Sequence, residues 1–188
     1  MTWQTPNKRW MAVLNLLVFG GLLSVVAQLS TPKTPDALNV PDASPLRLKA
    51  HGDGVQIYEC KSPGDAAGQF KWVLKAPEAD LIDEKGKKIG KHYAGPTWEA
   101  NDGSKVIGEL QQHVDAPGPD AIPWLLLKAK SNEARGIFKN VTYIQRLDTE
   151  GGKPPVAGCD SGHPNAEVRV HYTANYYFYG PSKPPTNK

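Results

Sequence analysis

Residues 92–104, HYAGPTWEANDGS, hold the side chains of this sequence that are best suited to chemistry. His92, Tyr93, Trp98 and Glu99 lie within a few positions of one another. An imidazole can donate or accept a hydrogen bond, a carboxylate accepts one, and aromatic rings offer a flat apolar surface. Such a set suits a pocket for a sugar or another small molecule, so we take these four as the candidate ligand-binding residues.

The other residues of this segment have structural roles. Gly95 and Pro96 are typical of a corner, and NDGS (101–104) is typical of the tight turn of a hairpin. We therefore expect a strand, a corner, a short strand and a hairpin. On a regular strand Trp98 and Glu99 would point to opposite faces, so a shared pocket requires Pro96 or a bulge to break the alternation. Without that break Trp98 is a core residue, and the segment has a structural role only.

No motif in the sequence identifies a reaction, so the catalytic residues stay unknown. The five histidines are scattered without HxH or HExxH spacing, and we predict neither a metal site nor a cofactor. A GxSxG elbow and a glycine-rich phosphate loop are absent. A glycosidase needs two carboxyl groups at a defined separation, which the sequence does not specify. Binding is therefore favoured over catalysis, while a hydrolase-like enzyme stays open as an alternative.

The N-terminus has the layout of a secretory signal peptide. Lys8 and Arg9 precede an apolar run that ends at Ala27. We predict a signal peptide over residues 1–27, cleaved after Ala27, and a protein that is secreted or periplasmic. An uncleaved membrane anchor is the alternative, although Asn15 interrupts the apolar run.

The charge distribution argues against a nucleic-acid partner. The sequence carries a formal charge of +3, but the leader contributes cations and no acid, and the remaining charges alternate in sign. The densest basic run, DEKGKK (83–88), surrounds a turn glycine and is typical of a solvated loop. The membrane is a partner only if the leader stays uncleaved, and nothing in the sequence indicates the oligomeric state.

Cys60 and Cys159 are the two cysteines of the sequence. In an oxidising compartment an isolated pair usually forms a disulfide. Closing so long a loop would remove denatured-state entropy worth roughly 4 to 5 kcal/mol. A Cys-x-x-Cys motif for redox or zinc chemistry is absent. We therefore predict a Cys60–Cys159 disulfide, with a reactive Cys159 as the alternative if both thiols are free.

Short segments of alternating apolar and polar residues, separated by turn residues, predict strands rather than helices. No apolar period of 3.6 residues lasts more than about two turns, so we expect an all-β fold, a single antiparallel sandwich or barrel-like domain. We divide the chain into the signal peptide, a Pro-rich linker over 28–47, the β-rich domain over 48–180 and a disordered tail over 181–188. The expected strands are GVQIYEC (54–60), FKWVLKA (70–76), KKIGKHY (87–93), KVIGELQQHV (105–114), PWLLLKAK (123–130), FKNVTYIQRLDT (138–149) and AEVRVHYTANYYFYG (166–180).

Two of these segments carry further information. PWLLLKAK is a continuous apolar run, as expected when both faces of a strand are buried. In the last segment one face should meet the core, and its residues are Val168, Val170, Tyr172, Ala174, Tyr176 and Phe178. Tyr177 and Tyr179 lie on the opposite face, where exposure would favour an interaction surface.

Several stretches resemble a known family: GVQIYEC, KHYAGPTWEANDGS, AIPWLLLKAK, NVTYIQRLDTEGGKPP with the following Cys159, and VHYTANYYFYG. Over about residues 40–180 the sequence resembles the secreted bacterial and fungal proteins catalogued as domain of unknown function 3455. The resemblance implies a single exported domain and carries over no activity. Three functions stay open: a carbohydrate or small-molecule binding module of the periplasm or extracellular space, which we favour, an envelope or matrix interaction protein, and a hydrolase-like enzyme.

Overall fold

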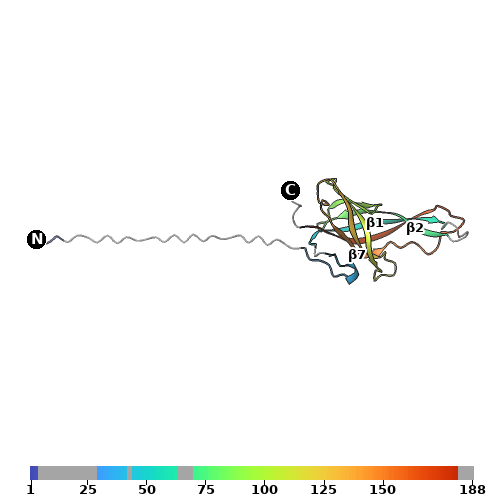
Figure 1. The fold of residues 1–188 in the computed structure, drawn as a ribbon, viewed down its shortest axis with the longest axis horizontal. Helices are drawn as coiled ribbons and strands as arrows, with labels where there is room; N and C mark the ends of the chain where they lie inside the picture. Colours follow the sequence, from blue (N-terminus) through green and yellow to red (C-terminus); the bar gives the residue numbers. More distant parts are fainter. Residues whose placement is uncertain (4–28, 42–43, 63–69, 182–188) are drawn as a thin grey trace.

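The computed structural model describes residues 1–3, 29–41, 44–62 and 70–181 (Figure 1). The predicted leader, apart from its first three residues, and the tail from residue 182 lie outside the described residues. No helix of the described part is long and apolar enough to cross a membrane. Its regular elements are η1 (Asp36–Leu38), β1 (Leu46–Lys61), β2 (Lys71–Ile82), β3 (Lys88–Tyr93), β4 (Thr97–Ala100), β5 (Lys105–Val114), β6 (Trp124–Glu133), β7 (Tyr143–Gly151) and β8 (Glu167–Tyr179).

The strands form one closed antiparallel barrel in which each strand pairs with the next and β1 pairs with β8. The last pairing runs from Leu46 opposite Tyr179 to Glu59 opposite Glu167, so two long strands close the wall. Among the described residues each strand therefore has a paired neighbour on both sides along at least part of its length. The all-β class is therefore confirmed, and of the two architectures that the sequence left open the chain adopts the barrel.

One expected strand is wrong at its start. Residues 138–149 were expected to form one strand, but residues 138–140 form a turn, 141 and 142 have no regular structure, and β7 begins only at Tyr143. Asn140 has φ of +69°, and the Val141 N–H donates to the Phe138 carbonyl at 3.3 Å. A residue in the left-handed region cannot continue an extended strand. The β-branched and aromatic residues here had indicated strand, but the backbone of Asn140 ends that pattern.

The barrel interior is packed by alternate residues of the strands. In β8 the side chains of Tyr172, Ala174, Tyr176 and Phe178 are fully buried in the inner core cluster, as the alternation predicted. Trp98 of β4 packs edge-on against Tyr176, with the ring centroids 5.5 Å apart. The aromatic residues of β8 therefore form one side of the core.

A second buried cluster lies on the outer face of β6, β7 and β8. There Leu126, Leu147, Tyr177 and Tyr179 pack against Leu38 of η1. Since Leu127 belongs to the inner cluster, both faces of the PWLLLKAK strand are buried, as predicted. We call residues 29–41 the N-terminal strap. Part of the segment that the sequence indicated as a linker is thus packed on the barrel, and it covers Tyr177 and Tyr179.

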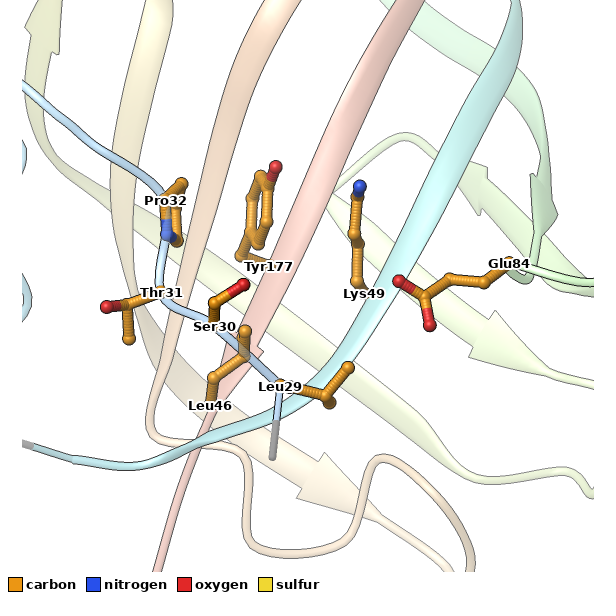
Figure 2. A pocket seen from close by; sticks show the side chains of 8 residues that line it. All are labelled: Leu29, Ser30, Thr31, Pro32, Leu46, Lys49, Glu84 and Tyr177. Atoms are coloured by element: carbon orange, nitrogen blue, oxygen red, sulfur yellow. The ribbon is translucent and has the colours of Figure 1, made fainter. Parts of the chain in front are cut away.

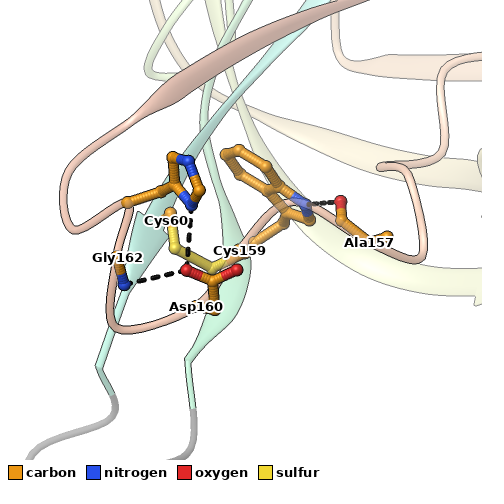
Figure 3. Close-up of a disulfide and its surroundings, with 7 residues drawn as sticks. Cys60, Ala157, Cys159, Asp160 and Gly162 are labelled. Atoms are coloured by element: carbon orange, nitrogen blue, oxygen red, sulfur yellow. Dashed lines mark hydrogen bonds and ion pairs between the residues drawn. A yellow bond between two sulfur atoms is a disulfide. The ribbon is translucent and has the colours of Figure 1, made fainter.

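The predicted Cys60–Cys159 disulfide is present, with an S–S distance of 2.03 Å (Figure 3). It ties the end of β1 to the loop that precedes β8. The loop has further anchors, since the indole of Trp72 donates to the Ala157 carbonyl at 3.2 Å and Asp160 accepts from the Gly162 N–H at 2.8 Å. Neither cysteine is free, so the alternative of a reactive Cys159 is overturned.

Candidate functional site

The candidate ligand-binding residues lie on the hairpin of β3 and β4, which has the expected strand, corner and short strand. His92 stands opposite Trp98 and Lys91 stands opposite Glu99, in a register without a bulge. The alternation of faces is therefore intact. His92 and Trp98 face the barrel interior, whereas Tyr93 and Glu99 lie on the outer face. The break at Pro96 that a shared pocket required is not present, and the four side chains do not converge.

The outer pair belongs to a closed network of polar groups. The Tyr93 hydroxyl donates to Glu99 Oε2 at 2.7 Å, and Lys91 Nζ and Lys105 Nζ lie 3.6 and 3.7 Å from the same oxygen. The hydrogen bond to Glu99 raises the pKa of Tyr93 to about 12 and lowers the pKa of the Glu99 carboxyl. These groups satisfy one another. Tyr93 and His92 also line a hollow of about 420 Å³, whose charged residues, Asp53, Glu78, Asp80, Lys91 and Arg169, carry both signs.

The inner pair is deeply buried. The rings of His92 and Trp98 are stacked with centroids 4.4 Å apart, and His92 Nδ1 lies 2.9 Å from the Thr97 carbonyl oxygen. A carbonyl only accepts, so Nδ1 carries the proton and Nε2 is left as an acceptor. Burial lowers the pKa of His92 to about 3, although the bond to Thr97 opposes the shift. His92 is therefore neutral at physiological pH.

A cavity of about 420 Å³ lies beside His92 within the barrel. Two exposed side chains, Leu74 and Leu110, line it with 52% and 53% of their surface accessible, so the cavity reaches solvent. The rest of its apolar wall includes Pro77, Pro96, Leu125 and Leu127. We call this space the barrel cavity. Of the four predicted residues, His92 alone lines it.

Two polar residues that the sequence analysis did not select also line the barrel cavity, Gln56 of β1 and Arg146 of β7. Gln56 is only 1% exposed, and its Nε2 has no hydrogen-bond partner. Arg146 donates from Nε and Nη2 to the Pro123 carbonyl at 3.2 and 2.8 Å. The alternation could have identified Arg146, because it lies two residues from the buried Ile144 and therefore shares its face.

The groups around Arg146 are uncharged. The hydroxyls of Tyr172 and Tyr176 lie 3.1 Å apart, and burial raises the pKa of both, although Arg146 opposes the rise. No Asp or Glu lines the barrel cavity, and no carboxylate of the described residues forms an ion pair with Arg146. Lys75, the other cation at the cavity, is paired with Glu167. The cavity therefore holds one uncompensated positive charge.

A further hollow, of about 390 Å³, lies where the N-terminal strap crosses the outside of the barrel (Figure 2). Figure 2 shows Lys49 between Tyr177 and Glu84, and Lys49 Nζ lies 5.7 Å from the centroid of the Tyr177 ring. Its charged groups have opposite signs, so this hollow lacks the charge imbalance of the barrel cavity. No group of three or more His, Cys, Asp or Glu side chains within the described ranges could hold a metal ion.

Residues 41–180 match a family model described as a protein of unknown function (DUF3455). The match covers well over half of the sequence, so the chain belongs to this family. It includes every strand of the barrel, the disulfide and the residues of the barrel cavity. Neither the curated proteins nor the solved structures contain a match to the chain.

Proposed function

We propose that this protein is an exported binding module that holds a small, mainly apolar molecule in the barrel cavity. The observation that carries the proposal is a cavity of about 420 Å³ with an apolar wall and a few inward polar groups. Ligand pockets typically measure roughly 300 to 1,000 Å³ and have this composition. An eight-stranded barrel is also wide enough to hold one small ligand.

The composition of the wall favours an apolar ligand over a carbohydrate. Leucine and proline side chains dominate the barrel cavity, whereas a sugar would need several polar groups beside an aromatic platform. Tyr93, which could have supplied such a platform, lies on the outer face and is bound to Glu99. The signal-peptide pattern and the disulfide support the exported setting, because disulfides persist in oxidising compartments.

The envelope or matrix alternative depended on an exposed aromatic face. Tyr177 and Tyr179 are instead buried under the N-terminal strap. A catalytic role has no support in the cavity, where His92 is neutral and its Nδ1 already donates to a carbonyl. Binding in the barrel cavity is therefore the function with the strongest structural argument.

The proposal can be tested with N-phenyl-1-naphthylamine, a neutral apolar dye that fluoresces when it leaves water. Titration of the folded, disulfide-bonded protein should give a saturable rise in fluorescence. Leu110→Trp places a larger side chain at the rim of the barrel cavity and should weaken binding severalfold. Val73→Trp is the matched control, because Val73 is also exposed but does not line the cavity. Equal binding by both variants, or no saturable signal, would refute the proposal.

A further inference from the structure

We infer that the molecule held in the barrel cavity carries a carboxylate or a chemically similar anionic group, which Arg146 and Gln56 bind. This inference rests on the proposed function and names the ligand class of the same site. It follows from two independent features of the cavity, a charge without a counterion and a buried donor without an acceptor.

The first feature is the guanidinium of Arg146. It stays protonated in proteins and has five N–H donors, of which Nε and Nη2 share the Pro123 carbonyl as acceptor, and it also hydrogen-bonds the Tyr176 hydroxyl, which is neutral. Arg146 is partly buried beside an apolar wall, and charges in such surroundings are normally paired because desolvation is costly. No carboxylate of the described residues forms an ion pair with Arg146, and its neighbours His92, Tyr172 and Tyr176 are uncharged. The missing charge is therefore expected on the ligand.

The second feature is the amide of Gln56. Its Nε2 is a buried donor without a partner, in a residue that lines the same cavity. Most buried donors in native proteins are satisfied, so an exception calls for an explanation. Nε2 itself is shielded from solvent, so a ligand oxygen in the cavity would supply the missing acceptor after the amide turns toward it. A neutral hydroxyl could satisfy Gln56 but not the charge of Arg146, whereas a carboxylate has enough lone pairs for both.

The rest of the ligand is indicated by the wall. Leu125, Leu127, Pro77 and Pro96 line the cavity with apolar surface that suits hydrocarbon. Leu74 and Leu110 extend this surface to the mouth of the cavity. The occupant is thus an amphipathic molecule with its anionic end at Arg146 and its hydrocarbon part against the leucines, as in a medium-chain carboxylic acid.

Decanoate and decanol provide a matched pair of probes, since they share a chain and differ in the charge of the head group. Each should displace N-phenyl-1-naphthylamine from the folded protein at neutral pH, and we expect decanoate to bind about tenfold or more tightly than decanol. Arg146→Met should remove this preference while decanol still binds, and Arg146→Lys should keep part of it. Arg169→Met is the control, because Arg169 lies on the outer face and pairs with Glu78.

Each outcome decides between the two proposals. Equal affinities for decanoate and decanol, or a preference that survives Arg146→Met, would overturn the inference while dye binding still supports the proposed function. If neither the dye nor either probe binds, the proposed function fails and this inference fails with it. If Arg146→Met does not fold, Gln56→Leu decides, since the inference requires it to weaken decanoate severalfold more than decanol.

Discussion

Gln56 and Gln145 are both almost fully buried in the same barrel wall, yet their hydrogen bonding differs. Gln145 donates from Nε2 to the Leu38 carbonyl and accepts at Oε1 from the Tyr179 hydroxyl, both at 2.6 Å. Gln56 has a donor, Nε2, without a partner. A buried amide whose donor and acceptor are both hydrogen-bonded stabilises the fold. A buried amide beside a cavity whose donor has no partner can instead bind a ligand.

The surroundings of Gln145 and Gln56 also differ, since one is closed by packing and the other borders a cavity. Around Gln145 the N-terminal strap closes the outer cluster, with Leu38 fully buried against Leu147 and Tyr179. Around Gln56 the barrel opens into a cavity whose rim residues are half exposed. Changes under the strap should therefore affect stability, whereas changes in the cavity should affect binding.

The largest effect is expected from Leu38→Ala, which removes the centre of the outer cluster. Leu38 is fully buried, so the variant should lose about 3 kcal/mol of unfolding free energy from lost burial and the space left behind. Urea unfolding with the disulfide intact measures it. Leu29→Ala changes an exposed leucine of the same strap and should have a small effect. A loss below about 1 kcal/mol for Leu38→Ala would show that the strap adds little to stability.

Gln145→Leu should cost about 2 kcal/mol, because it leaves the Leu38 carbonyl and the Tyr179 hydroxyl buried without partners. Adding Tyr179→Phe removes one of these orphaned groups, so the double variant should lose less than the sum of the single losses. The same urea unfolding series measures all three proteins. Strict additivity would contradict the hydrogen-bonded link between the strap and β8.

His92→Gln tests the cavity side through pH. The pKa of His92 is about 3 in the folded protein and near 6.5 when unfolded, so the unfolded chain binds the extra proton between these values. Stability that is present above pH 6.5 is therefore lost as the pH falls toward 3. Between pH 7 and 5.5 the native protein should lose about 1 kcal/mol from this group, and His92→Gln should lack that loss. His113→Gln replaces an exposed histidine as the control. Equal slopes in the native protein and His92→Gln would show that His92 is not held neutral by burial.

Local sequence patterns predicted much of the fold. The alternation in β8 identified its inner face, and the turn residues identified the corner at Gly95 and the hairpin at Gly103, both of which have positive φ. Barrel closure could not be predicted, because it depends on the pairing of β1 with β8 at opposite ends of the domain. The packing of Leu38 was also hidden, since an isolated leucine among prolines shows no periodicity.

The candidate site was predicted only in part, for a physical reason. Clustering in the sequence drew attention to His92, Tyr93, Trp98 and Glu99, but strand alternation separates such neighbours onto two faces. The residues that share the barrel cavity come from different strands, and a polar side chain in a strand usually indicates the solvent face. Arg146 could have been recognised from its spacing to Ile144, whereas the open donor of Gln56 required the surrounding structure.

The smallest effect on stability, and the sharpest test of the comparison, is expected from Gln56→Leu. Gln56 Nε2 has no partner, so replacement by a side chain of similar size removes an unsatisfied donor and leaves no new orphan there. The free energy of unfolding should be unchanged or rise by up to about 1 kcal/mol, in contrast to the loss from Gln145→Leu. Decanoate affinity should fall severalfold in the same protein, because the carboxylate loses a donor. A gain in stability together with a loss of binding would show that Gln56 is kept for the ligand, whereas a loss of stability with unchanged binding would assign it to the fold, as for Gln145.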